Sequence, residues 1–429
     1  MTEGKINMVN HFNKSKSQRK IVVAMDSFKG SLTSLEAGNA VRDGILEKYP
    51  DFDVQIFPVA DGGEGTVEAL TFGKEHVQTQ TIPVTGPVGT EVLAGYTIYE
   101  QAGEKTAVLE MAQAAGLPFV PEERRNPMHT TTYGVGEMIR DAITCGCRKF
   151  ILGIGGSATN DAGIGMLQAL GYHFLDATGR EVDYGAEGLA QVRSITTEDV
   201  MPELASCTFQ IACDVTNPLV GAQGCSAVFA PQKGADAKMV QAMDVAMNRY
   251  ADIVEDMYRK NPVLIENQLT GYDEAGKNLE KTDRQSQVKN RMTPGTGAAG
   301  GLGYACLMFL HAALKPGIDI VLDEIQIAQA IKTADAVITG EGRFDAQTLM
   351  GKTPIGVARI AKAYEVPVYA FAGCFGADVQ VCIDSGVFAG CYAASTASTE
   401  EEKWLAMEKR HAYANLKACV KAHFFEENN

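Results

Sequence analysis

The sequence predicts an α/β protein in which a mostly parallel sheet, with helices on both faces, is interrupted by a second, mixed α/β domain. Near both ends of the 429-residue chain, short β-branched runs alternate with helix-like stretches, a pattern typical of parallel sheets. Between about residues 81 and 110, hydrophobic and polar residues alternate around turn signals, which favours antiparallel strands. The length leaves room for two or three domains.

The first elements follow one another as strand, loop and helix. Residues 1–19 are polar and are expected to form a disordered tail. The run KIVVAM at 20–25 predicts a strand, and the capping box TSLE at 33–36 predicts the helix after it. The run 54–60 predicts a second strand, followed by a loop and a helix that begins at Thr66. We therefore assign residues 20–80 to the parallel-sheet domain.

The inserted domain is predicted to occupy residues 81–294. Its helix should carry Val135, Met138, Ile139 and Ala142, and a strand should follow over 150–154. Residues 261–292 are strongly polar, which predicts an exposed insertion. The strand and helix pattern resumes at 336–339 and 367–372, so residues 295–429 are assigned to the parallel-sheet domain.

Composition and charge exclude several classes of function. With 38 Lys and Arg against 53 Asp and Glu, the net charge of −15 disfavours nucleic acid and anionic membranes as partners. The ten cysteines contain no C-x-x-C pair, so no zinc site is expected. No signal peptide is evident, which predicts a cytoplasmic protein with free thiols. The uncharged stretch 292–314 holds Pro294 and five glycines, which favours a glycine loop before a buried helix over a membrane span.

Five segments place glycine and polar residues directly after apolar runs. They are DSFKGS at 26–31, DGGEGT at 61–66, GIGGSATND at 153–161, PGTGAAGGLG at 294–303 and GEGRFDAQTLMGKT at 340–353. The backbone amides of such loops, and the start of a following helix, hold phosphate without a basic patch. A single loop of this kind is more often only a tight turn. Five of them together favour a polyphosphate ligand.

Phosphoryl transfer needs cations on the migrating group, carboxylates for magnesium, and a base for the acceptor hydroxyl. Lys29, Arg343 and Lys352 are candidate cations. The candidate carboxylates are Asp26, Asp61, Glu64, Asp161, Asp214 and Asp345. A lone loop carboxylate is more often a helix cap or a turn former, so each of these residues also has a structural interpretation.

A second class of enzyme fits part of the same pattern. GIGGSA at 153–158 matches the dinucleotide fingerprint G-x-G-x-x-A after a predicted strand, and Asp176 follows at the end of a plausible next strand. An NAD-dependent dehydrogenase of a small hydroxy acid is therefore the alternative hypothesis. Against it, Ser157, Thr159 and Asn160 in the same loop suit a hydroxylated substrate or a metal shell.

Taken together, the loops resemble those of the bacterial type 1 glycerate kinases, which phosphorylate D-glycerate with ATP. DSFKGS, DGGEGT, GGSATNDAG and GEGRFDAQ carry the likeness, which runs in order from about residue 20 to residue 372. Met25 stands where the family usually has proline. The resemblance implies a flavodoxin-like domain built from both chain ends, an inserted second domain, and an active site in the cleft between them.

The resemblance also implies a reaction and its residues. We expect an ATP- and Mg²⁺-dependent glycerate 2-kinase that yields 2-phospho-D-glycerate, an organic acid phosphorylation in glyoxylate, glucarate or galactarate breakdown. Asp345 is the expected base and Asp161 the alternative, with Lys29 and Arg343 neutralising charge. The expected nucleotide-binding residues are Gly62, Gly63, Gly65, Thr66, Gly155, Gly156, Ser157, Gly340, Gly342 and Lys352, and the expected magnesium ligands are Asp26, Asp61, Glu64 and Asp214. The expected partners are D-glycerate and ATP, with no nucleic acid and no membrane, and a homodimer stays open.

Overall fold

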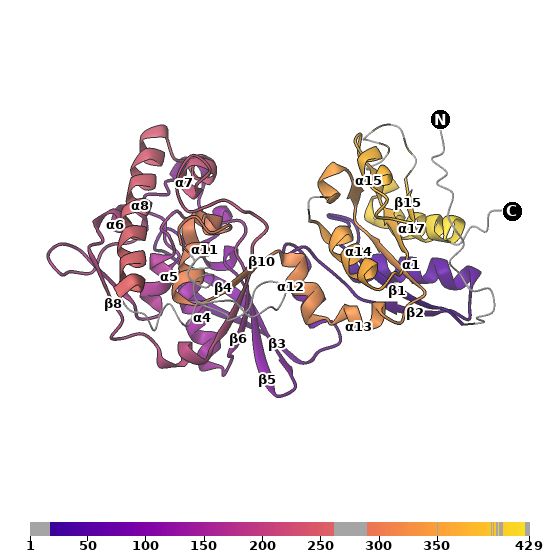
Figure 1. Cartoon of the computed structure of the whole chain (residues 1–429), viewed down its shortest axis with the longest axis horizontal. Helices are drawn as coiled ribbons and strands as arrows, with labels where there is room; N and C mark the ends of the chain where they lie inside the picture. The colour runs from indigo at the N-terminus through magenta and orange to yellow at the C-terminus, as the bar shows by residue number, and fades with distance from the viewer. Residues whose placement is uncertain are drawn as a thin grey trace. The chain divides into compact units, whose positions relative to one another are not determined.

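The computed structural model describes residues 18–260, 290–349, 351–395, 397, 399, 402 and 406–424. The chain forms two compact units. The terminal unit comprises Met1–Phe72 and Pro316–Asn429, and the inserted unit comprises Gly73–Lys315. Figure 1 shows the indigo start and the orange to yellow end of the chain in the terminal unit. Most of the predicted tail and residues 261–289 of the predicted insertion lie outside the described residues.

The terminal unit is built on a sheet of five parallel strands in the order β15-β13-β11-β1-β2. The strands are β1 (Lys20–Met25), β2 (Asp53–Ile56), β11 (Ala336–Gly340), β13 (Val368–Ala372) and β15 (Gly390–Ala393). Numbered along the chain, this order is 2-1-3-4-5, the flavodoxin-type arrangement. Its winding direction reverses between β1 and β11, and ligands of such sheets bind beside the carboxyl ends of the strands at that point.

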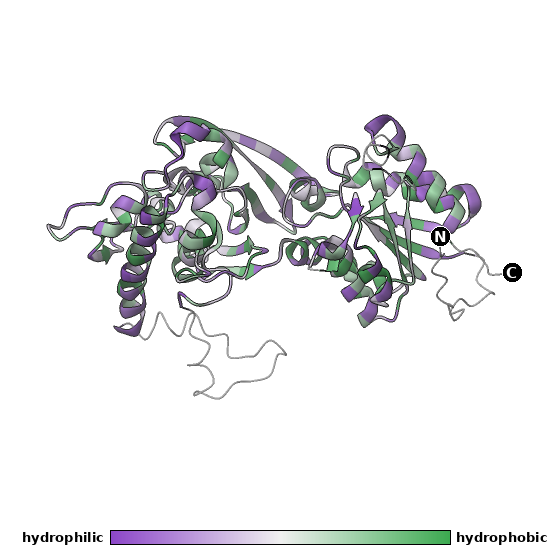
Figure 2. Cartoon of the chain, turned by 90° about the horizontal axis from the view of Figure 1, so that it is seen from above, coloured by the Kyte–Doolittle hydropathy of each residue, from purple (hydrophilic) through white to green (hydrophobic). Residues whose placement is uncertain are grey.

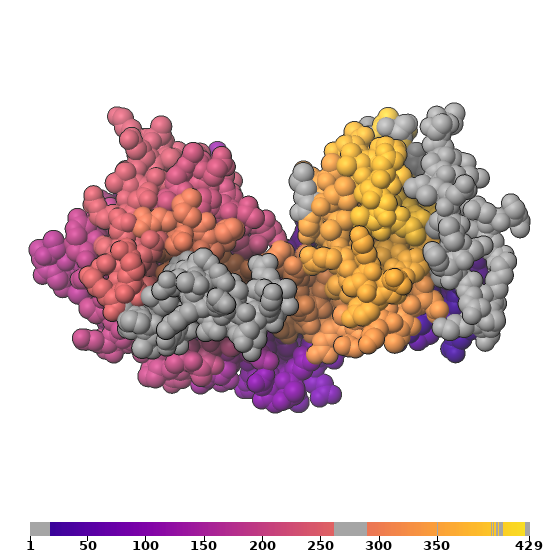
Figure 3. Space-filling model, viewed as in Figure 1, coloured from indigo at the N-terminus to yellow at the C-terminus, as the bar shows by residue number. Residues whose placement is uncertain are grey.

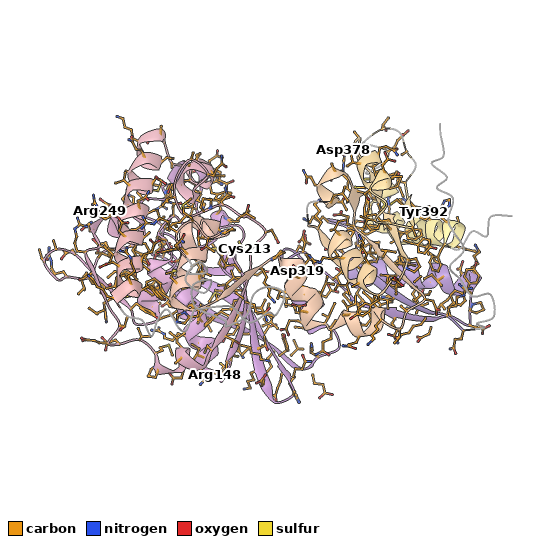
Figure 4. The ribbon with its side chains drawn as sticks, viewed as in Figure 1. Arg148, Cys213, Arg249, Asp319, Asp378 and Tyr392 are labelled. Carbon is orange, nitrogen blue, oxygen red and sulfur yellow. The ribbon has the colours of Figure 1, made fainter. Side chains whose placement is uncertain are left out.

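Helices cover both faces of this sheet. On one face α1 (Ser34–Lys48) packs along α17 (Lys409–His423), although the two helices come from opposite ends of the chain. The predicted capping box of α1 is confirmed, with the Thr33 and Glu36 side chains bonded to each other's backbone. The other helices in the described part of this unit are α2 (Thr66–Thr71), α12 (Gly317–Glu324), α13 (Ile327–Ile331), α14 (Thr353–Ala363) and α15 (Gln380–Asp384). The pair α12 and α14 is joined by an ion pair between Asp319, labelled in Figure 4, and Arg359.

The distribution of apolar residues explains this layering. Buried side chains of β1 alternate between the two faces, and Ile21, Val23 and Met25 share a core with α1 and α17. Figure 2 shows largely hydrophobic strands in this sheet and hydrophilic residues on the surrounding helices. In the view of Figure 3, most of the surface of the terminal unit consists of orange and yellow residues from its carboxyl-terminal segment.

The inserted unit holds a mixed six-stranded sheet in the order β10-β9-β6-β5-β4-β3. The strands are β3 (Glu75–Thr85), β4 (Glu91–Gln101), β5 (Glu104–Glu110), β6 (Lys149–Gly153), β9 (Thr208–Ala212) and β10 (Ala313–Lys315). The predicted antiparallel pairing is confirmed for β3 with β4 and for β4 with β5. The pairs β5–β6, β6–β9 and β9–β10 are parallel. The chain changes unit at residues 72–73 and 315–316, outside the predicted limits of 81 and 294, because β3 and β10 belong to this sheet.

Helices pack around the mixed sheet. They are α3 (Ala112–Ala115), α4 (Tyr133–Thr144), α5 (Ile164–Ala169), α6 (Gly185–Gln191), α7 (Cys225–Phe229), α8 (Ala237–Lys260) and α11 (Ala298–Phe309). Nearly every residue of α11 is buried, which confirms the predicted glycine loop before a buried helix. Among the described residues, no helix is long and apolar enough to cross a membrane.

Candidate functional site

A pocket lies in the terminal unit beside the ends of β1 and β11, where the winding of the sheet reverses. Residues 26–31 and 341–343 line it, together with Asp61, Asp345, Lys352, Cys374 and Met407. The two strand ends are tied together, since the amide of Asp26 donates to the carbonyl of Gly340 at 2.9 Å. Two of the predicted loops, 26–31 and 340–345, therefore meet at one edge of the sheet.

The loop after β1 begins with a buried carboxylate. Asp26 is 6% exposed and accepts hydrogen bonds from the Ser27 amide and the Thr353 hydroxyl, both at 2.6 Å. Burial raises the pKa of Asp26 to about 6, and the nearby charge of Asp61 adds to the increase. The turn that follows closes through Gly30, whose φ of 74° favours glycine, and Lys29 precedes it in the pocket wall.

The loop after β11 supplies a second buried carboxyl, Glu341. Its Oε1 accepts the hydroxyl of Thr348 at 2.7 Å, and its Oε2 lies 3.7 Å from the Nζ of Lys352. Burial raises the pKa of Glu341 to about 7. Gly340 just before it has a packing role, because a Cβ there would lie 1.8 Å from the carbonyl oxygen of Phe371.

Arg343 and Asp345 complete this wall. The guanidinium Nε of Arg343 lies 3.9 Å from Oδ2 of Asp345, and Oδ1 of Asp345 accepts the amide of Gln347 at 2.9 Å. Lys352 is the N-cap residue of α14 and lies 31% exposed by side chain. Three cations, Lys29 among them, therefore share the pocket with four carboxyl groups, an arrangement suited to a polyphosphate and to proton transfer.

The carboxylates also fit a magnesium ion. Across the described ranges, no group of three or more His, Cys, Asp or Glu is arranged to hold a metal by itself. Magnesium is commonly bound by only one or two carboxylates, with substrate phosphates and water supplying its other ligands. Asp26 and Asp61 both line the pocket and offer hard oxygen donors, so they fit this mode of binding.

The rest of the DGGEGT loop does not line the pocket. The Asp61 carboxylate accepts the Gly63 amide at 3.2 Å, and the Thr66 hydroxyl donates to the Gly63 carbonyl at 2.7 Å, where α2 begins. Gly65 is the N-cap residue of α2, with a φ of 88°. Gly62, Gly63, Glu64, Gly65 and Thr66 thus form the turn that presents Asp61.

The other predicted residues lie in the inserted unit. Asp161 is fully buried, and it accepts the Thr132 amide and hydroxyl at 2.8 Å and the Gly163 amide at 3.1 Å. These bonds anchor the loop that contains Gly155, Gly156 and Ser157 to the start of α4. Asp214 is exposed in the loop after β9.

The dinucleotide fingerprint at 153–158 is not formed. The β6 strand ends at Gly153 and α5 begins only at Ile164, whereas the fingerprint requires the helix to open within the glycine motif. Asp176 holds a local turn, with its Oδ1 accepting the amides of Thr178 and Arg180. The strand before Asp176 pairs with β8 (Ser194–Thr196) in a separate two-stranded sheet and does not belong to the sheet that contains β6. This geometry argues against the alternative hypothesis of an NAD-dependent dehydrogenase.

Comparison with known proteins identifies the family. The model of the glycerate kinase family matches residues 21–423. The chain belongs to the glycerate kinase family. It is 44% identical over 370 residues to a glycerate kinase of Haemophilus influenzae, with 86% of this chain and 89% of that protein covered. It is 40% identical over 397 residues to the glycerate 2-kinase of Escherichia coli, with coverage of 92% and 95%.

A solved structure supports the same assignment. The crystal structure of putative glycerate kinase 2 from Salmonella typhimurium matches with a TM-score of 0.76 and 40% identity. The match covers 94% of this chain and 98% of that one. Together with the flavodoxin-type strand order, this confirms the two-part α/β architecture expected for a glycerate kinase.

Two buried charged residues of this member of the glycerate kinase family were not among those predicted from the sequence. Glu341 lies inside the GEGR segment, directly after the largely apolar strand β11, and this position could have indicated it. Lys233 is 2% exposed in the inserted unit, in the 3₁₀ turn η4 (Pro231–Lys233). Nothing in its local sequence distinguishes it from a surface lysine.

Proposed function

We propose that this protein is an ATP-dependent glycerate kinase that transfers the γ-phosphoryl group to the 2-hydroxyl of D-glycerate. The observation that carries the proposal is the pocket at the end of β1 and β11, in which three cations surround buried carboxyl groups, in a chain of the glycerate kinase family. The name of the Escherichia coli relative, glycerate 2-kinase, supports the 2-hydroxyl as the acceptor. The product would be 2-phospho-D-glycerate.

The three cations and one carboxylate of the pocket have distinct roles in this proposal. Lys29, Arg343 and Lys352 neutralise the phosphate oxygens of ATP. Asp345 takes the proton of the acceptor hydroxyl while the hydroxyl oxygen bonds to the γ-phosphorus and the bond to the β-phosphate oxygen breaks, which releases ADP.

Magnesium would be held by Asp26 and Asp61, because these two predicted ligands line the pocket, whereas Glu64 and Asp214 do not. When bound, the ion would neutralise charge on the phosphate oxygens. Asp161 is less suited than Asp345 to act as the base, because both of its oxygens already accept hydrogen bonds in the loop of the inserted unit.

The proposal is tested by incubating the purified protein with D-glycerate, ATP and Mg²⁺. One aliquot is coupled to enolase alone and another to phosphoglycerate mutase and enolase. A signal with enolase alone supports 2-phosphoglycerate as the product. A signal only with the mutase would assign the 3-hydroxyl, and no ADP in either aliquot would reject D-glycerate as the acceptor.

We further propose that the enzyme works in the cytoplasm, in the phosphorylation of organic acids from glyoxylate, glucarate or galactarate breakdown. All ten cysteines are free, as is usual for proteins of reducing compartments. Fractionation of the source cells with an antibody to the protein would test the location. Sedimentation of the purified chain would test the homodimer.

A further inference from the structure

The inserted unit contains a buried cation with neutral hydrogen-bond acceptors. The Lys233 side chain donates at 2.7 Å to the Ser157 hydroxyl and at 2.7 Å to the Thr159 carbonyl oxygen. Among the described residues, no carboxylate lies within ion-pair distance of its nitrogen. A buried ammonium without a direct counter-ion is costly, so its charge calls for an explanation other than local stability.

The surroundings of Lys233 make its charge sensitive to pH. Burial lowers its pKa to about 8, while Cys225 and Asp161, the ionisable groups that interact with it, act in the opposite direction. Asp161 is itself occupied by Thr132 and Gly163, as described above. Within the part of the chain that the structure describes, Lys233 therefore has no direct counter-ion, and its own hydrogen bonds go to neutral groups of the loop that contains residues 155–159.

The loop 155–157, which contacts the Lys233 side chain through Ser157, exposes part of its backbone to solvent. Gly155 and Gly156 are exposed, whereas Ser157 is buried against the lysine. The carbonyl of Gly156 accepts the Leu117 amide at 2.9 Å. In the described part of the chain, the amides of residues 155–157 donate to no protein group.

Two further features show that a ligand could approach this loop and form hydrogen bonds with it. A Cβ added at Gly155 would meet nothing within 4 Å, so a ligand atom can approach the backbone there. The Thr159 hydroxyl is buried and has no hydrogen-bond partner in the structure. Consecutive amides around a glycine with positive φ, such as Gly156 at 73°, form a concavity that binds anions.

We propose that the loop 155–157, held from beneath by Lys233, binds the carboxylate of the hydroxy-acid substrate. This inference rests on the proposed function. Because the lysine nitrogen is buried, Lys233 is a positioning residue that acts through Ser157, Thr159 and its charge. One cation without a direct counter-ion matches the single charge of a carboxylate, whereas the three cations of the pocket in the terminal unit suit the polyphosphate of ATP.

The first test compares steady-state constants of full-length variants. Lys233→Met removes the charge at similar volume, and we expect it to raise KM for D-glycerate about tenfold or more while KM for ATP stays within about twofold. Lys233→Arg retains the charge and should recover part of the affinity for D-glycerate. A rise in KM for ATP alone would assign the loop to a phosphate group and overturn the proposal.

A second variant covers the case in which Lys233→Met does not fold. Gly155→Ala adds a methyl group where the folded protein has open space, so it should fold normally and still raise KM for D-glycerate. Gly95→Ala, where the new Cβ would have only ordinary contacts in β4, is the matched control. Unchanged KM for D-glycerate in Gly155→Ala and in any folded Lys233→Met protein would overturn the proposal.

The third readout is the pH dependence of D-glycerate binding, measured by calorimetry without ATP. The wild-type affinity should fall as the pH rises through about 8, where Lys233 loses its proton, and the affinity of Lys233→Met should not. Binding that depends on Lys233 in a protein that forms no ADP would support this inference and reject the proposed function. Turnover that is unaffected by substitution of Lys233 or Gly155 would support the proposed function and reject this inference. Absence of D-glycerate binding in the wild type would also overturn the inference.

Discussion

The Thr353 hydroxyl donates a 2.6 Å hydrogen bond to Oδ2 of Asp26, although 327 positions separate the two residues in the chain. Both side chains are buried. The bond joins the first turn of α14 to the end of β1 and so orients a carboxylate at the point where the winding of the sheet reverses. It lowers the pKa of Asp26 and opposes part of the increase that burial causes.

Removal of this bond should be visible in the pH profile. Thr353→Val keeps the shape of the side chain but loses the donor, so the pKa of Asp26 should rise above its present value of about 6. We expect the acid limb of kcat/KM to move to higher pH, with a loss of about 1–3 kcal/mol in stability. Thr353→Ser should restore the wild-type profile. An unchanged acid limb in a folded Thr353→Val protein would show that Asp26 does not control it.

Asp345→Asn tests the proposed base. Because a base acts in the transition state, kcat should fall about 10²–10⁴-fold while both KM values change little. Asp378→Asn is the control, since Asp378 is exposed and lies beside α15 in Figure 4. Near-normal kcat in Asp345→Asn would exclude this residue as the base.

Lys352→Met tests the cation at the start of α14. Its charge lies 3.7 Å from Glu341 and faces the pocket, so its removal should raise KM for ATP about tenfold or more. KM for D-glycerate should change less. The exposed Lys362, at the other end of α14, supplies the control Lys362→Met. Equal effects of the two substitutions would argue against contact between Lys352 and the nucleotide.

Glu341 should make the stability of the protein depend on pH. Its folded-state pKa of about 7 lies above the ordinary value of 4.5, so its contribution to stability is fully present below about 4.5 and is lost as the pH rises through 7. Glu341→Gln removes this titration. Relative to wild type, the variant should gain about 2 kcal/mol in free energy of unfolding between pH 5 and pH 8, measured with urea. A pH-independent difference would contradict the raised pKa.

Gly340→Ala should destabilise the terminal unit. The new Cβ would lie 1.8 Å from the Phe371 carbonyl oxygen and 2.6 Å from Cε of Met25, and the backbone atom cannot yield without moving β13. We expect a loss of about 1–3 kcal/mol. Thermal unfolding of this variant should be compared with that of Gly155→Ala, for which no neighbour lies within 4 Å. Equal melting temperatures would mean that the strand ends adjust freely.

Much of the fold follows from local patterns. The strand at 20–25, the capping box at Thr33 and the start of α2 at Thr66 were predicted correctly, because β-branched runs and caps act within a few residues. Gly340 was predicted to bind the nucleotide, and the structure shows in addition a packing role between strands that local spacing did not predict. Asp161 was singled out for its place in a polar loop, yet its hydrogen bonds go to Thr132 in another segment.

By itself, the sequence determined the α/β class, the glycine loops after strands, and a likeness to the glycerate kinases, since these depend on residue type and short spacing. Only the tertiary structure decided which loops share a pocket and which charges are buried. Glu341 and Lys233 have unusual pKa values because segments distant in the chain exclude water from them. Desolvation depends on contacts across the fold, so the local sequence could at most indicate Glu341, by its place after an apolar strand, and it did not indicate Lys233.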